Sequence, residues 1–104
     1  MNIKELHETN YEHYYVTTDG EVYSWYGKKP VLCMKHHDNG NGYVFVVIYG
    51  KKLYVHRLMG ETFLGLDLNS NLQINHKNKV RDDNRLCNLE IVTRSENMKH
   101  AYAK

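Results

Sequence analysis

Residues 72–100, LQINHKNKVRDDNRLCNLEIVTRSENMKH, decide the fold of this chain. Leu72-Gln73-Ile74 alternates apolar and polar residues, and Leu89-Glu90-Ile91-Val92 is a second short apolar run, as expected of two short strands. A polar connection over residues 77–85 separates them. Thr93-Arg94-Ser95-Glu96 then matches the S/T-x-x-E capping box, which starts a helix by reciprocal hydrogen bonds between side chains and backbone. The stretch predicts strand, long loop, strand and helix.

The residues before this stretch favour β structure. Residues 14–25 place alternating polar and apolar positions around the turn-forming triplet Thr18-Asp19-Gly20 and predict one hairpin. Residues 43–55 are rich in β-branched and aromatic residues, and Gly50-Lys51-Lys52 is expected to reverse the chain within them. The N-terminal half therefore predicts two hairpins.

A helix is expected between the two halves. Its spacing lets Leu58, Thr62 and Phe63 share one face, and Gly65 is available to end it. With 104 residues the chain has the length of one domain. We therefore expect an α+β fold in a single domain over residues 1–104, with a β-rich part over 1–55, a connecting helix over 56–65 and a strand–strand–helix unit over 72–104.

Composition restricts the class of protein. The formal net charge is +2, from 14 Lys and Arg against 12 Asp and Glu, so overall charge indicates nucleic-acid binding only weakly. Cys33 and Cys87 stand far apart and form neither a CxxC pair nor a disulfide framework. No apolar run approaches the roughly 18 residues of a membrane span, and the N-terminus lacks the apolar stretch of a signal peptide. We expect a soluble cytoplasmic protein with no membrane partner.

A group of polar residues in the C-terminal stretch suggests chemistry. Asn75 and His76 follow the first short strand, and Asn97 lies in the first turn of the capped helix. Folding the strands back onto the helix brings these residues to one cleft, where carboxamide oxygens suit a hard cation. His100, three residues after Asn97, faces the same side of the helix. A histidine that accepts a proton from water, beside a metal ion that stabilises phosphoryl charge, meets the requirements of phosphodiester hydrolysis.

Three segments, residues 74–77, 83–93 and 95–101, agree in order and spacing with a known motif. They resemble the HNH (ββα-metal) unit of phage and intron-encoded homing endonucleases. Upstream, residues 15–24 resemble the β-rich module that often precedes this nuclease, and residues 55–63 resemble the helix that leads into it. The resemblance implies a C-terminal ββα-metal unit and a divalent-metal-dependent DNA endonuclease that nicks duplex DNA. It also implies a phage origin, and hence the cytoplasm of the host cell.

Site roles follow from the resemblance residue by residue. His76 takes the role of general base, and Asn88 belongs to the catalytic set as the residue that braces the hairpin loop by hydrogen bonds. Asn97 and Asn75 take the metal-ligand positions, with His100 as a further candidate ligand. Mg²⁺ or Mn²⁺ is the expected ion. Ni²⁺ and Zn²⁺ are the alternatives, zinc in particular if the imidazole of His100 also binds the ion. Many relatives carry Asp where this chain has Asn75, so a catalytically decayed DNA-binding module stays open as the alternative, as does an RNA nuclease.

Double-stranded DNA is the expected partner, bound by a monomer or homodimer. Tyr43, Tyr49 and Tyr54 are candidates for DNA contact, and His56 either contacts phosphate or braces the helix onto the nuclease hairpin. Asp82 and Asp83 rank low as ligands and would cancel part of the loop charge. Cationic side chains in or beside the motif, and in the second hairpin, are expected to bind phosphates. They are Lys51, Lys52, Lys77, Lys79, Arg81, Arg85, Arg94 and Lys99.

Overall fold

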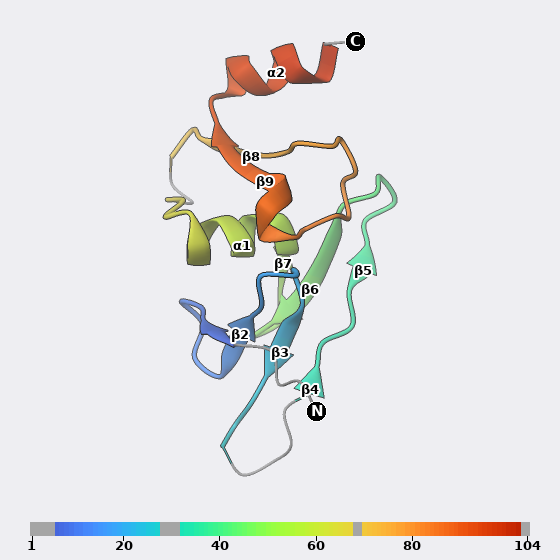
Figure 1. Cartoon of the computed structure of the whole chain (residues 1–104). Helices are drawn as coiled ribbons and strands as arrows, with labels where there is room; N and C mark the ends of the chain where they lie inside the picture. The colour runs from blue at the N-terminus through green and yellow to red at the C-terminus, as the bar shows by residue number, and fades with distance from the viewer. Residues whose placement is uncertain (1–5, 28–31, 68–69, 103–104) are drawn as a thin grey trace.

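The computed structural model of the chain describes residues 6–27, 32–67 and 70–102, without the side chains of residues 32 and 100–102. Antiparallel sheets make up the N-terminal half and helix α2 lies at the C-terminal end, so the fold is α+β as predicted (Figure 1). The elements in chain order are β1 (His7–Glu8), β2 (Tyr14–Val16), β3 (Val22–Ser24), β4 (Leu32–Cys33), β5 (His37–Asp38), β6 (Val44–Ile48), β7 (Lys51–Tyr54), α1 (Val55–Phe63), β8 (Gln73–His76), the 3₁₀ turn η1 (Leu86–Asn88), β9 (Leu89–Val92) and α2 (Arg94–Tyr102).

The first sheet contains β1 to β4 in sequence order. Strands β2 and β3 form the predicted first hairpin, with Val16 paired to Val22 and both side chains fully buried. The N–H of Gly20 donates to the carbonyl of Thr17 over 3.0 Å to close the turn, and the φ of Gly20 is 84°, a conformation that favours glycine. Strands β1 and β4 were not predicted, because two residues are too few to show an alternating pattern.

The second sheet has the order β5-β6-β7 and contains the second predicted hairpin. The chain reverses at Tyr49 and Gly50, whose φ values are 53° and 74°, while Ile48 pairs with Lys51. Two positive φ angles are typical of a type I′ turn, whose twist matches that of the flanking strands. The prediction that Lys51 and Lys52 form the turn is therefore wrong, because a two-residue turn leaves both lysines in β7.

The third sheet, β8 with β9, lies between the two helices (Figure 1). Pairing of Asn75 with Glu90 and of His76 with Leu89 extends β8 through His76. Asn75 and His76 are thus the last two residues of the strand, whereas the sequence analysis placed them just after it. Ile74 packs closely on α1, since a Cβ at Gly60 would lie 2.5 Å from its Cδ1 atom.

Helix α1 and the buried apolar side chains join the two halves of the chain. The helix begins one residue before the predicted start and ends at Phe63, and Gly65 follows with a φ of 70°. The core draws on the first two sheets, α1, and β8 with β9. Its fully or largely buried members are Val16, Val22, Val46, Ile48, Val55, Leu58, Met59, Leu66, Ile74 and Leu89.

Helix α2 begins with the predicted capping box. The backbone N–H of Thr93 donates to Oε1 of Glu96, and the N–H of Glu96 donates to Oγ1 of Thr93, each over 3.1 Å. These hydrogen bonds occupy backbone donors that a helix start leaves without intrahelical partners. Within the described ranges, neither helix is long and apolar enough to cross a membrane.

Candidate active site

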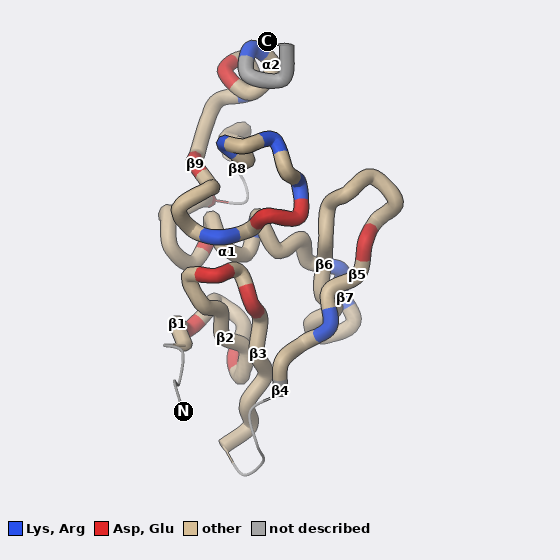
Figure 2. The backbone as a smooth tube through the Cα atoms, turned by 45° about the vertical axis from the view of Figure 1, so that its right-hand side comes forward, with Lys and Arg blue, Asp and Glu red and all other residues tan. Residues whose placement is uncertain are grey.

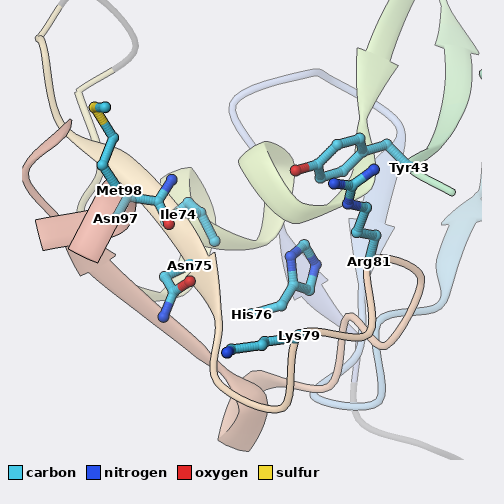
Figure 3. A pocket seen from close by; sticks show the side chains of 8 residues that line it. All are labelled: Tyr43, Ile74, Asn75, His76, Lys79, Arg81, Asn97 and Met98. Carbon is cyan, nitrogen blue, oxygen red and sulfur yellow. The ribbon is translucent and has the colours of Figure 1, made fainter. Parts of the chain in front are cut away.

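A pocket of about 290 Å³ lies beside β8, between the start of α2 and the loop that follows the strand (Figure 3). Three predicted site residues meet there: Asn75 and His76 from the end of β8, and Asn97 from α2. Folding thus brings together the candidate base and two candidate ligands. The residues that line the pocket are Tyr43, Ile74, Asn75, His76, Lys79, Arg81, Asn97 and Met98.

Side chains alternate along strand β8, so the site residues lie on two opposite faces of the strand. Successive side chains of a strand point to opposite faces, so Gln73 and Asn75 share one face while Ile74 and His76 share the other. Nδ2 of Asn97, in α2, donates to Oε1 of Gln73 over 2.7 Å, so α2 covers the face that carries Gln73 and Asn75. Helix α1 covers the opposite face. Among the described strands, β8 pairs only with β9. Side chains from both faces of β8 line the pocket, which lies along the edge of β8 that does not pair with β9.

His76 is held in one orientation by Asn84. The imidazole is 5% exposed, and its Nε2 atom lies 2.8 Å from Oδ1 of Asn84. Because an amide oxygen only accepts hydrogen bonds, Nε2 carries the ring proton and Nδ1 keeps its lone pair. Nδ1 is therefore the atom that can accept a proton from water. Asn84 was missed in the sequence analysis, because no local pattern shows that the polar loop returns it to His76.

The β2–β3 turn supports the loop residue that orients His76. The N–H of Leu86 donates to the carbonyl of Thr18 over 2.8 Å. Gly20 lies so close to this loop that a Cβ at position 20 would be 2.6 Å from the carbonyl oxygen of Asn84. The N-terminal hairpin therefore sets the position of Asn84 by direct backbone contact.

His56 packs against His76 from helix α1. The two ring centroids are 5.4 Å apart, and the rings of Tyr43 and Tyr54 lie 5.2 and 5.8 Å from that of His56. Burial, together with the neighbouring His76 and Arg57, lowers the pKa of His56 to about 4. A neutral, half-buried ring in this position supports the bracing role considered for His56 rather than contact with phosphate.

We predict that protein stability falls as the pH drops below about 6.5, because of His56. Its pKa is about 4 in the folded chain, below the ordinary histidine value of 6.5, so the unfolded chain binds the proton more readily between these values. The stabilisation that comes from His56 is complete above the pKa of the unfolded chain and is lost as the pH falls toward the pKa of the folded chain. Its maximum is about 3 kcal/mol. Urea unfolding at a series of pH values measures this loss.

His56→Phe is the control for that series, since it keeps a planar ring and removes the titrating group. The variant is expected to show a flatter dependence of unfolding free energy on pH. An equally steep dependence in His56→Phe would assign the effect to another group.

Asn88 makes the hydrogen bonds that a brace of the loop requires. Its side chain is buried, its Oδ1 accepts the N–H of Asn78 over 3.0 Å, and its Nδ2 donates to Oδ1 of Asn78 over 2.9 Å. Nδ2 also donates to the carbonyl of Asp83 over 2.9 Å. Asn88 is not among the residues that line the pocket, so its influence on the site runs through the loop.

Asn75 and Asn97 each use the amide nitrogen in a hydrogen bond to a neighbouring side chain. Nδ2 of Asn75 donates to Oε1 of Glu90 over 2.9 Å, and Nδ2 of Asn97 donates to Oε1 of Gln73 over 2.7 Å. The Oδ1 atom of each side chain is therefore the atom that can coordinate a cation. Amide oxygens are hard donors, which Mg²⁺ and Mn²⁺ favour, so the residues present fit a hard divalent ion.

Comparison with known proteins agrees with this geometry. Residues 53–99, which include the candidate base and both amides, match the sequence family described as HNH endonuclease. The solved structure of the HNH homing endonuclease I-HmuI, reported for its DNA binding and cleavage, superimposes with a TM-score of 0.76 at 32% identity. That match covers 91% of this chain and 56% of I-HmuI.

In sequence and in fold, the chain is similar to HNH endonucleases. It is 34% identical over 100 residues to the H-N-H endonuclease F-TflII of Escherichia phage T5, which is 91% of this chain and 49% of the relative. It is also 30% identical over 95 residues to the uncharacterized HNH endonuclease L245 of Acanthamoeba polyphaga mimivirus, which is 88% of this chain and 28% of that relative. The chain thus spans about half, or less, of the length of these curated relatives.

Two of the predicted DNA-binding cations reach the HNH pocket. Lys79 and Arg81 line it, and Figure 2 shows Lys and Arg along the loop between β8 and β9. The guanidinium carbon of Arg81 lies 5.0 Å from the ring centroid of Tyr43, and its Nη1 donates to the carbonyl of Asn41 over 2.8 Å. Arg81 is therefore held beside the pocket by two contacts, and its contact with phosphate remains a prediction.

The other predicted cations lie outside the pocket lining, although all are exposed. Arg85 binds Asp83 through two hydrogen bonds of 2.8 and 2.7 Å, which lower the pKa of Asp83 and raise that of Arg85. Lys52 lies on β7 with its Nζ 4.5 Å from the ring centroid of Phe45. The DNA-contact roles predicted for these cations remain predictions. They are Lys51, Lys52, Lys77, Arg85, Arg94 and Lys99.

The remaining candidate ligands of the HNH site have different outcomes. His100 lies in α2, but its side chain falls outside the described residues, so its role as a ligand remains a prediction. Asp83 is engaged by Asn78 and Arg85 and is not in the pocket lining. Across the described ranges, no group of three or more His, Cys, Asp or Glu is placed to hold a metal. Among the described side chains, the candidate ligand atoms are the amide oxygens of Asn75 and Asn97.

Proposed function

We propose that this chain is a divalent-metal-dependent endonuclease that nicks duplex DNA. The observation that carries the proposal is His76, with Nε2 bound to Asn84 and Nδ1 available as a base beside the pocket where Asn75 and Asn97 meet. The similarity to HNH endonucleases supports the same reaction class.

The chain's own residues supply most of the proposed reaction. Nδ1 of His76 accepts the proton of the water that attacks phosphorus, and Asn84 holds the ring through Nε2 so that Nδ1 is the nitrogen left for this role. Arg81 and Lys79 pair with phosphate oxygens and position the strand. Asn75 and Asn97 would hold the cation through their Oδ1 atoms. When bound, a divalent ion stabilises negative charge on the phosphoryl group and on the leaving 3′ oxygen.

Attack on phosphorus with loss of the 3′ oxygen leaves 5′-phosphate and 3′-hydroxyl ends. One base in each chain acts on one strand in each encounter, so a monomer should produce nicks. A double-strand break would require two chains or two successive encounters. Duplex DNA is the proposed substrate because cations flank the pocket and the structural relative is described as a DNA-cleaving enzyme.

Cleavage of supercoiled plasmid tests the proposal. The chain is incubated with Mg²⁺, Mn²⁺, Ni²⁺ or Zn²⁺ in turn, and with EDTA as the metal-free control. Mg²⁺ or Mn²⁺ is expected to convert supercoiled plasmid to open circles, and EDTA is expected to prevent it. Linear product without an open-circle intermediate would contradict nicking by a monomer.

The alternative is a DNA-binding module without activity, which the neutral side chain of Asn75 favours because a neutral ligand attracts a divalent ion less strongly than a carboxylate. That function would be indicated if the chain retains a plasmid in a mobility-shift assay and no ion supports cleavage. A labelled RNA duplex in the same assay separates a preference for RNA, since hydrolysis of RNA alone would exclude a DNA endonuclease.

A further inference from the structure

The candidate ligands Asn75 and Asn97 are neutral, and the pocket around them is basic. Among the described residues, its lining includes Lys79 and Arg81 but no Asp or Glu. Neutral amides attract a divalent ion less strongly than a carboxylate does, so the ligands themselves bring no negative charge to the ion. A carboxylate from just behind the lining would supply it.

Glu90 is placed to provide that charge. It is the partner of Asn75 across the β8–β9 pair, so both side chains lie on the same face of the sheet. Oε1 of Glu90 accepts the hydrogen bond from Nδ2 of Asn75 over 2.9 Å. Gln73 accepts the equivalent hydrogen bond from Asn97, but an amide brings no charge. Glu90 is therefore the carboxylate bound directly to a candidate ligand.

A hydrogen bond from an amide to a carboxylate changes both atoms that matter at a metal site. It fixes the amide with its nitrogen toward the carboxylate and its oxygen away from it. It also draws the amide proton toward a negative charge, which makes the amide oxygen a stronger ligand for a metal ion. Carboxylates that accept a hydrogen bond from a metal-bound histidine strengthen that ligand in the same way. The pair Asn75–Glu90 then acts as one ligand with a net negative charge.

We propose that Glu90 is a positioning residue that supplies, through Asn75, the negative charge missing from the cation site. The proposal rests on the proposed function, since it requires a divalent ion at Asn75 and Asn97. The negative charge that a carboxylate ligand would bring to the ion is then carried by Glu90 on the neighbouring strand β9.

Mn²⁺ affinity of the full chain, measured as free Mn²⁺ by electron paramagnetic resonance, tests the proposal without a cleavage assay. Glu90→Gln keeps the size of the side chain and removes its charge, and is expected to raise the Kd for Mn²⁺ by about 10- to 100-fold. The double variant Asn75→Asp with Glu90→Gln returns the charge to position 75. It is expected to restore the Kd to within about threefold of that of the unmodified chain.

Glu61→Gln is the matched control. Glu61 also accepts a hydrogen bond from an asparagine, Nδ2 of Asn10, over 2.8 Å, and is not in the pocket lining. This substitution removes the same charge and should leave the Kd for Mn²⁺ unchanged. An equal loss of affinity in Glu61→Gln and Glu90→Gln would show an effect of net charge and overturn the proposal.

One further variant, Asn97→Ala, separates failure of this proposal from failure of the metal site itself. Asn97→Ala should weaken Mn²⁺ binding if the metal site exists, whatever Glu90 does. If Asn97→Ala weakens binding but Glu90→Gln does not, or if the double variant fails to restore it, the role of Glu90 is wrong and the metal site stands. If the unmodified chain binds no Mn²⁺, or Asn97→Ala leaves affinity unchanged, the metal site is wrong and the role of Glu90 falls with it.

The hydrogen bond itself is tested in the metal-free chain. The side-chain amide signals of Asn75 in a ¹⁵N–¹H spectrum should move when Glu90→Gln replaces a charged acceptor by a neutral one. Glu61→Gln should leave those signals in place. Unmoved Asn75 signals in Glu90→Gln would overturn the proposal.

Discussion

His76→Ala is expected to lower the rate of plasmid nicking by about 10²- to 10⁴-fold, the usual contribution of a general base. The substitution removes the nitrogen that accepts a proton from water and leaves the cations around the pocket in place. Affinity for the same DNA should therefore change little. Single-turnover cleavage and a mobility-shift titration on one preparation measure the two quantities separately.

His37→Ala is the matched control for this prediction, because His37 is exposed on β5 and away from the pocket lining. It should cleave at the rate of the unmodified chain. A His76→Ala variant that keeps its cleavage rate would show that another group removes the proton. A variant that loses DNA binding in parallel with cleavage would show that His76 holds the substrate or the fold.

Gly20→Ala is expected to destabilise the chain by about 3 kcal/mol or more, through backbone strain and steric overlap together. The φ of residue 20 is 84°, and its added Cβ would lie 2.6 Å from the carbonyl oxygen and 2.8 Å from the carbonyl carbon of Asn84. Both of those atoms belong to backbone, so relief requires the loop to move. Urea unfolding followed by circular dichroism measures the loss.

Gly50→Ala isolates the contribution of backbone strain, so the difference between the two variants gives the steric part of the effect. The φ of Gly50 is 74°, but a Cβ there would meet nothing within 4 Å, so only backbone strain of about 1 kcal/mol is expected. Where Gly20→Ala still folds, its cleavage rate should also fall, since Asn84 would shift away from His76. Equal stabilities for the two alanine variants would show that the contact between residues 20 and 84 is not tight.

Local signals in the sequence were sufficient for most of the fold. The capping box at Thr93 and the turn triplet around Gly20 each act over a few residues, so their outcome does not depend on distant packing. The turn of the second hairpin was misplaced because Tyr49 adopts a positive φ, which is uncommon outside glycine. The two-residue strands have no pattern of their own and exist only because neighbouring strands pair with them.

The candidate site was predicted only in part, for a physical reason. Motif spacing identified Asn75, His76 and Asn97, because order along the chain is preserved in the resemblance. Their partners could not be found in the same way. Asn84 reaches His76 through the path of a loop, whereas Glu90 meets Asn75 through strand register, which a pairing of the two predicted strands could have exposed.

The placement of β8 between two helices gives neighbouring residues different surroundings. His76 packs with His56 of α1, whereas Asn75 shares its face of the sheet with Gln73, which binds Asn97 of α2. If the proposed function holds, substitutions on α2 should change which ion is preferred without disturbing the proton acceptor, and substitutions on α1 should change the acceptor without disturbing the ion. The neighbouring residues Asn75 and His76 would then determine two properties, ion binding and proton transfer, that substitutions can change separately.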